Sequence, residues 1–461
     1  MYGGDETGGL VLDIGSSTAK VGFAGEETPK GVFPSIGICS SLGGGGEGSE
    51  DVEMVDAGSN KTGKRTIYVG HSNAFFRRDH GEVVGAMASE GGAVENWDVL
   101  ENVYDHALKS VLRVTPSEHP LLVAEPPATS RADSEKNVEM LFEKFDAPAV
   151  FLAKQPVLAS FSTGRATSLV VDMGHSGVTC TAVHDGYALT KSVGRSPVGG
   201  RALNELMLTW LDTASGARVR PRHLFRRTQT DSGGWAVEDL AYPKTTESFN
   251  HYHRMLVAQD FKESVIQVSG TAWDYGEAGA ASAGGTTETM GGISVANIPS
   301  VNSELPDGTE VGIGAERYRL GECYFTPRLA TGFLPDSSAK LPWHDSALLE
   351  GLAEPKGLAS LILEAVGRCD VDVRKELYGG VLLCGGGSTC GGLKERLERE
   401  LADNAPPGAK VKVIAAQPPE RRHGTWIGGS ILASLGSFQQ MWMSKAEYQE
   451  HGASLVKRKC P

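Results

Sequence analysis

The chain has 461 residues, of which 40% are hydrophobic and 22% charged, a composition typical of a folded soluble protein with room for two to four domain-sized units. Its formal net charge of −13 disfavours a surface built to bind DNA phosphates, although a local basic patch remains compatible with it. The seven cysteines show no C-x-x-C spacing, which indicates a reducing compartment without a zinc knuckle, and no signal peptide or membrane-spanning run is recognised.

The first informative stretch covers residues 10–20, where an apolar run predicts a buried strand that ends at Asp13. Gly15 then allows a tight turn, and three hydroxyl side chains follow before the chain returns toward Lys20. Such a turn offers backbone N–H groups and hydroxyls to a phosphate chain, and Asp13 can hold a hydrated Mg²⁺ ion. An ordinary β-hairpin is the alternative interpretation of this stretch.

Strands alternating with helices follow, which indicates an α/β fold. The spacing of apolar residues predicts helices over 94–112, 130–145 and 156–163, and buried strands at 120–124 and around Phe151. The segment 38–65 is rich in glycine and acidic residues and has almost no apolar anchor, so we expect a disordered loop there.

The pattern of the first stretch returns at residues 168–179, where an apolar strand ends at Asp172 and the chain turns through glycine and small polar residues. A third glycine turn, at 385–389, follows the apolar run 381–383 and precedes a helical stretch, which suits a ribose and an α-phosphate. Two hairpins of one design predict two similar half-domains that face each other across a nucleotide.

The second half of the chain contains further predicted helices at 202–213, 358–369 and 392–402, and a strand at 411–415. Three segments, 214–245, 278–302 and 331–344, are interpreted as flexible insertions. Residues 218–227 are the most basic stretch of the chain, and either a solvated loop or a contact for an acidic partner or nucleic acid would explain them.

Several motifs together resemble the actin superfamily. They are D-x-G-S-x-x-x-K-x-G-F-A-G from Asp13, F-P-S from Phe33, E-N-W-D from Glu95, D-G-Y-A-L from Asp185, L-P-D-G from Leu305 and W-I-G-G-S-I-L-A-S-L from Trp426. The resemblance covers nearly the whole chain. It implies an actin-like ATPase fold of class α/β, with two similar lobes of mixed sheet flanked by helices around a nucleotide cleft. The small lobe would comprise residues 1–163 and 430–461, and the large lobe residues 164–429.

Within the superfamily the chain is more similar to the class-four actin-related proteins, through V-H-D-G-Y from Val183, K-S-V-G-R-S-P from Lys191 and Q-D-F-K-E-S from Gln259. That family is built into Swi/Snf-like remodelling, histone-exchange and histone-acetyltransferase complexes, where it pairs with actin on one long helix of a scaffold subunit. The resemblance implies a nuclear, non-polymerising architectural subunit rather than an enzyme. Its partners would be actin and a scaffold helix, and its cofactor ATP or ADP with Mg²⁺ or Ca²⁺; no membrane contact is implied.

The resemblance also assigns roles to single residues. Asp13 and Asp172 match the two aspartates that hold the metal ion through water, and Lys20 matches the phosphate-binding lysine. Gln155 falls where actin orients the attacking water, although a helix start without remaining chemistry would explain it equally, and no other catalytic residue is assigned. The implied nucleotide-binding residues are Asp13, Gly15, Ser16, Ser17, Thr18, Lys20, Asp172, Gly174, His175, Ser176, Gly177, Gly200, Arg201, Gly385, Gly386, Gly387 and Arg422.

Some positions depart from the actin pattern. His175-Ser176 stands where actin's second loop carries a further Asp, with one extra residue. Cys180 replaces the histidine near the attacking water, and a thiol cannot relay a proton as imidazole does near pH 7. We therefore expect nucleotide binding with slow or absent hydrolysis.

The nucleoside end departs as well. The Lys-Glu pair that flanks adenine in actin is aligned with His251-Tyr252, Thr389-Cys390 takes the place of a Met-Tyr pair, and Arg422 replaces a lysine. These changes would weaken the contacts to adenine.

Filament formation is not expected, because the glycine-rich, acidic segment 38–65 offers no apolar plug for a neighbouring subunit. By contrast, a helix predicted over 428–442 keeps an apolar stripe at helical spacing. In actin this helix borders the groove that accepts partner helices, and core packing is the alternative explanation of the stripe. The implied groove residues are Leu432, Leu435, Ser437 and Met441.

Two other functions stay open as alternatives. One is an active ATPase, either filament-forming and cytoskeletal like actin or phosphoryl-transferring like the sugar kinases. A sugar kinase would need a base beside its substrate hydroxyl, and the sequence shows no signature of one. The last alternative, direct binding to histones or nucleosomal DNA, rests only on the basic stretch 218–227.

Overall fold

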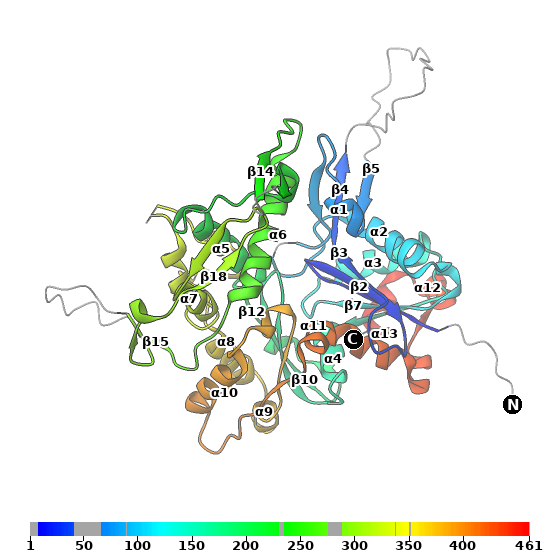
Figure 1. Ribbon diagram of the computed structural model, residues 1–461. Coiled ribbons are helices and arrows are strands. Elements are labelled where there is room, and N and C mark those ends of the chain that lie inside the picture. Colours follow the sequence, from blue (N-terminus) through cyan, green and yellow to red (C-terminus); the bar gives the residue numbers. More distant parts are fainter. Residues whose placement is uncertain are drawn as a thin grey trace, which may run out of the picture.

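The computed structural model describes residues 8–40, 66–88, 90–229, 235–274, 288–336, 338–349 and 352–460 (Figure 1). Two mixed sheets form its centre. The first has the strand order β22-β8-β7-β1-β2-β3 and consists of β1 (Leu10–Ile14), β2 (Thr18–Phe23), β3 (Gly31–Pro34), β7 (Leu121–Glu125), β8 (Ala149–Lys154) and β22 (Met443–Ser444). The second has the order β11-β10-β9-β20-β21, with β12 also paired to β10. Its strands are β9 (Ser168–Met173), β10 (Val178–His184), β11 (Tyr187–Ala188), β12 (Gly194–Ser196), β20 (Val381–Cys384) and β21 (Val413–Ala415).

The two sheets repeat one design. In the first, β3, β2 and β1 run antiparallel to one another, and β7 and β8 continue in parallel. In the second, β12, β10 and β9 are antiparallel in the same way, and β20 and β21 continue in parallel. The duplicated half-domains predicted from the two Asp-Gly hairpins are therefore present in the fold.

Helices surround both sheets. They are α2 (Trp97–Asp105, continued by a π-helical turn at His106–Leu112), α3 (Arg131–Glu143), α4 (Gln155–Phe161), α5 (Gly200–Thr213), α6 (Glu247–Val265), α7 (Glu316–Glu322), α8 (Leu358–Gly367), α9 (Val371–Tyr378), α10 (Leu393–Asn404), α11 (Pro418–Ser434), α12 (Lys445–His451) and α13 (Val456–Lys459). Several begin at a polar cap: Asn96 Oδ1 accepts the N–H of Val99, and Thr246 Oγ1 accepts that of Phe249. Along the described residues, no helix has both the length and the apolar character needed to cross a bilayer.

Smaller sheets extend the two lobes. On the first lobe lies the sheet β5-β4-β6, formed by β4 (Ile36–Ser40), β5 (Thr66–Val69) and β6 (Glu82–Gly85), with the short helix α1 (His71–Phe75). On the second lie the hairpin β13 (Phe225–Gln229) and β14 (Trp235–Asp239), the strands β15 (Trp273–Asp274), β16 (Thr289–Met290) and β17 (Ile293–Ser294), and the pair β18 (Val301–Glu304) and β19 (Glu310–Ile313).

Each large sheet has its own apolar core. The core of the first sheet combines the start of the chain with its end, because Trp426, Phe438 and Trp442 pack with Leu10 and Leu12. The core of the second sheet is built from residues 169–413. Helix α11 crosses the predicted boundary at 429–430 and packs against α4 at Gly428, where a Cβ would lie 1.7 Å from the Leu158 carbonyl oxygen. The two helices that link the lobes are therefore in backbone contact.

The structure differs from the sequence-based expectations in several segments. The helix predicted over 428–442 ends at Ser434, because Leu435 is extended (φ −72°, ψ 128°) and Gly436–Gln440 forms a separate 3₁₀ turn. Residues 38–40 of the predicted loop belong to β4, and residues 41–65 lie outside the described residues. The segment 278–302 contains strands from Thr289 onward, and within 331–344 Phe333 and Trp343 are buried in the second core.

Candidate functional site

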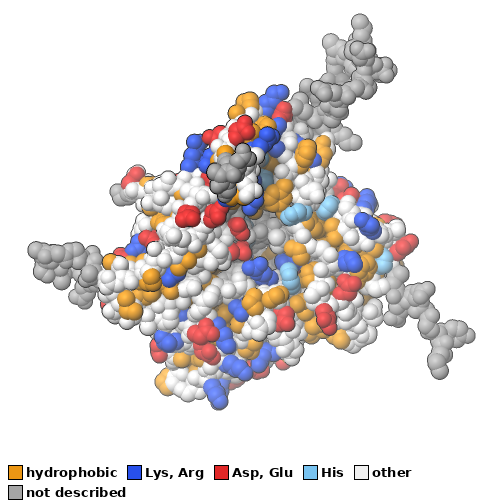
Figure 2. Space-filling model, in the orientation of Figure 1, with side chains coloured by type: hydrophobic (Ala, Val, Ile, Leu, Met, Phe, Trp, Pro, Cys, Tyr) orange, Lys and Arg blue, Asp and Glu red, His pale blue; other side chains and the backbone are white. Residues whose placement is uncertain are grey.

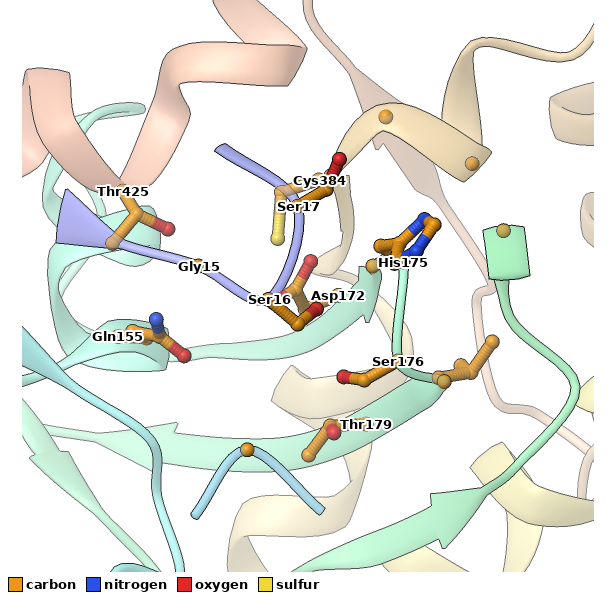
Figure 3. Close-up of a pocket in the computed structure, with 18 of the residues that line it drawn as sticks. Gly15, Ser16, Ser17, Gln155, Asp172, His175, Ser176, Thr179, Cys384 and Thr425 are labelled. Carbon is orange, nitrogen blue, oxygen red and sulfur yellow. The ribbon is translucent and has the colours of Figure 1, made fainter. Parts of the chain in front are cut away.

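The turns that follow β1 and β9 are built alike. The Gly15 N–H donates to the Thr18 carbonyl at 3.1 Å, and the Gly174 N–H donates to the Gly177 carbonyl at 2.9 Å. Both turns line a cleft of about 470 Å³ between the lobes. Figure 3 shows Ser16 and Asp172 close together there, with Gln155 on one side and His175 on the other.

The first loop holds an ion pair. Asp13 and Lys20 are direct partners in the antiparallel β1–β2 pairing, and Lys20 Nζ lies 3.0 Å from Asp13 Oδ2. Asp13 is 4% exposed, and its other oxygen accepts a hydrogen bond from Gln155 Nε2 at 3.3 Å. A buried carboxylate of this kind is held in place by both partners.

The second loop lacks such a cation, since the register of β9 and β10 places Thr179 opposite Asp172. Burial, and secondarily the charge of Asp13, raise the pKa of Asp172 to about 6, although Lys20 lowers it. The third glycine turn approaches the same carboxylate: Gly385 has φ +83°, and a Cβ there would lie 2.4 Å from Asp172 Oδ1. Only glycine fits this position without displacing the aspartate.

The second loop is also tied to the start of α5. The N–H groups of Gly200 and Arg201 donate to the carbonyls of Gly174 and His175, at 3.0 and 2.8 Å. The Arg201 side chain, predicted to bind nucleotide, instead bonds to Glu205 at 2.9 Å, and Arg201 is not among the described residues that line the cleft. Burial, followed by the charges of Lys262 and Arg201, lowers the pKa of His175 to about 4, so this imidazole is neutral at pH 7.

The nucleoside end differs from the sequence prediction. Lys262 and Glu263 of α6 line the cleft, whereas His251 and Tyr252 do not, so the alignment of the latter pair with the adenine-flanking residues is wrong. Burial lowers the pKa of Lys262 to about 8, and Glu263 pairs with Arg422 at 3.2 Å. Sequence reasoning missed Lys262 and Glu263, although the Q-D-F-K-E-S run that contains them had been singled out.

Cys180 faces away from the cleft. Along β10 the side chains of Cys180 and Ala182 pack in the second core, while Thr179 and Thr181 line the cleft; Val178, at the start of the strand, belongs to that core and also borders the cleft. Burial raises the pKa of the Cys180 thiol well above its ordinary value. The residue therefore has no access to an attacking water.

With the exception of Arg201, the structure brings the predicted nucleotide-binding residues to one cleft. Its lining includes Asp13, Gly15, Ser16, Ser17, Thr18, Lys20, Gln155, Asp172, Gly174, His175, Ser176, Gly177, Gly200, Gly385, Gly386, Gly387, Thr389, Cys390 and Arg422. The glycine turns leave room for phosphates beside backbone N–H groups, which fits a nucleotide. Among the described residues, no group of three or more His, Cys, Asp or Glu side chains is arranged so that it could hold a metal ion. Asp13 and Asp172 both line the cleft, and carboxylate oxygens are the kind of ligand that Mg²⁺ and Ca²⁺ take.

The basic stretch 218–227 leads through a 3₁₀ turn at Arg222–Leu224 into β13. Figure 2 shows blue side chains mixed with red and orange ones in the upper part of the second lobe. Arg220 pairs with Asp239 and Asp307, both at 2.8 Å, and Arg227 pairs with Glu304 at 2.7 Å. Two of its arginines are therefore engaged within the chain.

Of the predicted groove residues, Leu432 is half-buried, whereas Leu435, Ser437 and Met441 are exposed. Leu435 and Met441 are 40% and 39% exposed, and Ile431, in the last turn of α11, is 39% exposed. These three exposed apolar side chains, Ile431, Leu435 and Met441, lie within eleven residues at the end of α11 and in the turn after it, and are called the α11 apolar patch below.

Comparison with known proteins agrees with this architecture. The family described as Actin matches residues 4–461, so the chain belongs to the actin family. It is 43% identical over 477 residues to "Actin-related protein 4" of Oryza sativa subsp. indica and 42% identical over 476 residues to that of Arabidopsis thaliana, in each case across all of both chains. It is 30% identical over 473 residues to the protein of the same name from Schizosaccharomyces pombe, across all of this chain and 99% of that one.

Proposed function

We propose that this actin-related protein is a nuclear, non-polymerising architectural subunit of chromatin-remodelling and histone-acetyltransferase complexes, which binds ATP or ADP with Mg²⁺ or Ca²⁺ and pairs with actin on a scaffold helix. The observation that carries the proposal is the α11 apolar patch, because core packing alone would not leave Ile431, Leu435 and Met441 about two-fifths exposed. The similarity to proteins named Actin-related protein 4, at 43% and 42% identity across the full length of both chains, supports the proposal.

In this proposal the nucleotide is a structural ligand. Lys20 and the glycine turns bind phosphates, and a bound ion would neutralise the phosphate charge beside Asp13 and Asp172. Gln155 can orient a water but cannot take its proton, and its amide already donates to Asp13. His175, with its pKa near 4, is a weak base at pH 7. Both observations favour slow turnover.

A reconstitution tests the partner surface. The full chain is assembled with actin and the actin-binding helix of a remodeller scaffold subunit, and the complex is quantified by gel filtration. Met441→Glu should weaken assembly at least about tenfold, because it places a charge in an apolar contact. Ile293→Glu, at a 57% exposed position on β17, is the matched control. If folded Met441→Glu assembles like the control, the patch is not the partner surface.

Sedimentation tests the alternative of a filament-forming protein. In the salt and Mg²⁺ that polymerise actin, the purified chain should stay in the supernatant at micromolar concentration, and filaments in the pellet would refute the proposal. Purification from its own nuclei, followed by identification of what accompanies it, then distinguishes the complexes. Recovery without actin and remodeller or acetyltransferase subunits would count against the architectural role.

A further inference from the structure

One end of the molecule carries most of its exposed aromatic side chains. Among the described residues five aromatic side chains are exposed, and four of them lie at this end: Phe75, Phe76, Trp235 and Tyr242. Phe76 is 64% exposed and Trp235 54%. Figure 1 shows α1, which carries Phe75, and the hairpin of β13 and β14 at the same end, one on each lobe. We call these four side chains the aromatic tip, and apolar surface exposed in such a cluster is typical of a binding site.

Contacts across the lobe boundary bring the rings of both lobes to one side of the molecule. The Arg77 guanidinium, directly after Phe76 in the chain, lies 4.5 Å from the centre of the Tyr242 ring and donates to Thr245 Oγ1 at 3.3 Å. Trp235 begins β14 and precedes Tyr242 by seven residues, which places their Cα atoms at most about 25 Å apart. A single strand can bridge such a span, since sites for single strands cover about 4–16 nucleotides.

Arginine side chains stack on two of the rings. The Arg78 guanidinium lies 4.9 Å from the centre of the Phe76 ring, and the Arg227 guanidinium lies 4.6 Å from the centre of the Trp235 ring. Within the described residues Arg78 donates only to neutral acceptors, which are the Asn73 and Phe76 carbonyls and the Asn73 amide oxygen. Its charge is therefore not offset by a carboxylate, and the stacking fixes where that charge is presented.

The charged side chains of this end are mixed in sign. Three exposed arginines form no ion pair in the part of the chain that the structure describes; they are Arg218, Arg222 and Arg226. Three glutamates at the same end likewise have no cationic partner among the described residues; they are Glu82, Glu238 and Glu247. Blue, red and orange side chains accordingly alternate there in Figure 2. The surface thus offers unpartnered cations but little net positive charge.

We propose that the aromatic tip binds single-stranded nucleic acid, with unpaired bases stacked on the exposed rings and phosphates bound by the arginines that lack a carboxylate partner. Every base has a flat face that can stack on an aromatic ring, whereas the bases of a duplex are stacked on one another. The small net positive charge also disfavours a duplex, because binding to the duplex backbone depends on neutralising many phosphates. An acidic peptide would contact the arginines but leave the rings uncovered. The inference goes beyond the proposed architectural role and needs no nucleotide in the cleft.

Fluorescence anisotropy of labelled oligonucleotides tests the site. Oligo(dT) and oligo(U) of about 20 nucleotides, longer than one such site, are titrated with the full chain and with Phe76→Ala/Trp235→Ala. The affinity of the double variant for both strands should fall at least about tenfold, because two stacking platforms are lost. Tyr187→Ala is the matched control, since Tyr187 is 60% exposed and is the one exposed aromatic residue of the described chain outside the aromatic tip; its affinity should stay within about twofold of wild type. If thermal melting shows that the double variant does not fold, Phe76→Ala alone should weaken binding about fivefold.

Glu238 gives a test with the opposite sign. It stands opposite Arg226 in the β13–β14 register, and the described residues show no ion pair between the two. Glu238→Gln should therefore strengthen binding about two- to threefold, because it removes a negative charge beside the bound phosphates.

Several results would overturn the proposal. They are equal affinity in the double variant and Tyr187→Ala, no binding of either strand at about 100 µM chain, and tighter binding of a duplex or of an oligoglutamate peptide than of either strand. Equal affinity for oligo(dT) and oligo(U) would support a site that accepts either sugar. A preference of at least about tenfold for one strand would support the site and identify DNA or RNA as its ligand.

Discussion

The loop that follows β1 and the loop that follows β9 have similar backbone conformations and differ in charge. Each closes with a hydrogen bond from glycine to the carbonyl three residues later, and each follows a strand that ends near an aspartate. In the first loop the residue opposite the aspartate is Lys20, and in the second it is Thr179. Asp13 thus has a cation at 3.0 Å, while Asp172 is half-buried and has no cation opposite it, and desolvation raises its pKa to about 6.

The difference shows that the repeated fold fixes the positions of the loops but not their chemistry. The strand register decides which residue faces each carboxylate. Asp13 faces Lys20 and forms an ion pair, whereas Asp172 faces Thr179 and has a raised pKa. In the proposed nucleotide site, the first loop would supply a positive charge to the phosphates, and the second would supply a carboxylate that a bound cation would ionise. The following predictions test this division.

The largest effect is expected from Gly385→Ala, because the second loop, unlike the first, is packed against a third glycine turn. The new Cβ would lie 2.4 Å from Asp172 Oδ1 on a backbone with φ +83°. Unfolding in urea should show a loss of about 2–4 kcal/mol. Gly386→Ala, where no atom lies within 4 Å of the added Cβ, should cost about 1 kcal/mol or less. Equal losses in both variants would contradict the close packing.

Lys20→Met removes the cation of the first loop while keeping the length of the side chain. ATP affinity, measured by calorimetry, should fall about 10- to 100-fold, the value of one charge-assisted contact. Lys191→Met changes a surface lysine that pairs with Asp370 and should leave the affinity unaltered. If Lys20→Met lowered the ATP affinity less than threefold, the first loop would not be the source of positive charge for the phosphates.

Asp172→Asn tests the raised pKa. Folding raises the pKa of this acid from 3.8 to about 6, so the folded state binds more protons within that window. Wild type should therefore lose stability as pH rises through the window, and the asparagine variant should not. Without nucleotide, the unfolding free energy of wild type should fall by about 2 kcal/mol relative to that of the variant between pH 4.5 and pH 7. If the unfolding free energies of the two proteins changed in parallel with pH, the raised pKa of Asp172 would be contradicted.

Thr179→Lys, the smallest change, gives the second loop the lysine of the first. The new cation opposite Asp172 should lower the pKa of that carboxyl, so the pH dependence described above should shrink by about half. The measurement is the same pair of urea curves, with Thr181→Lys, two residues along the strand, as the control. An unchanged pH dependence would show that Asp172 is governed by burial alone.

Much of the cleft could be predicted from the sequence because its signals are local. The apolar runs that end at Asp13 and Asp172, and the glycine turn at Gly385, each lie within a few residues, and the structure brings them together. The end of α11 had a local signal as well, since Gly436 is a helix breaker, but the apolar stripe outweighed it in the prediction.

The rest depends on contacts between distant segments. The Q-D-F-K-E-S run that contains Lys262 and Glu263 indicates the family but not the cleft, because the packing of α6 brings these two residues to the cleft. The direction of the Cys180 side chain depends on which face of β10 meets the core, and its match to an actin histidine near the attacking water predicted the other face. The hydrogen bond from the Thr246 hydroxyl to the Gly81 carbonyl joins residues more than 160 positions apart, so no local sequence signal predicts it.

The discontinuous first lobe has a consequence for biosynthesis. Trp426, Phe438, Trp442 and Cys460 belong to a core that otherwise ends near Leu158, so the ribosome adds about 300 more residues before that core can close. At about 5–20 residues per second this takes roughly 15–60 s, during which apolar strand surface stays open to solvent. The nascent chain therefore has the exposed apolar surface that chaperones bind, and removal of the last turn should destabilise the first lobe, because Val456 and Cys460 belong to its core.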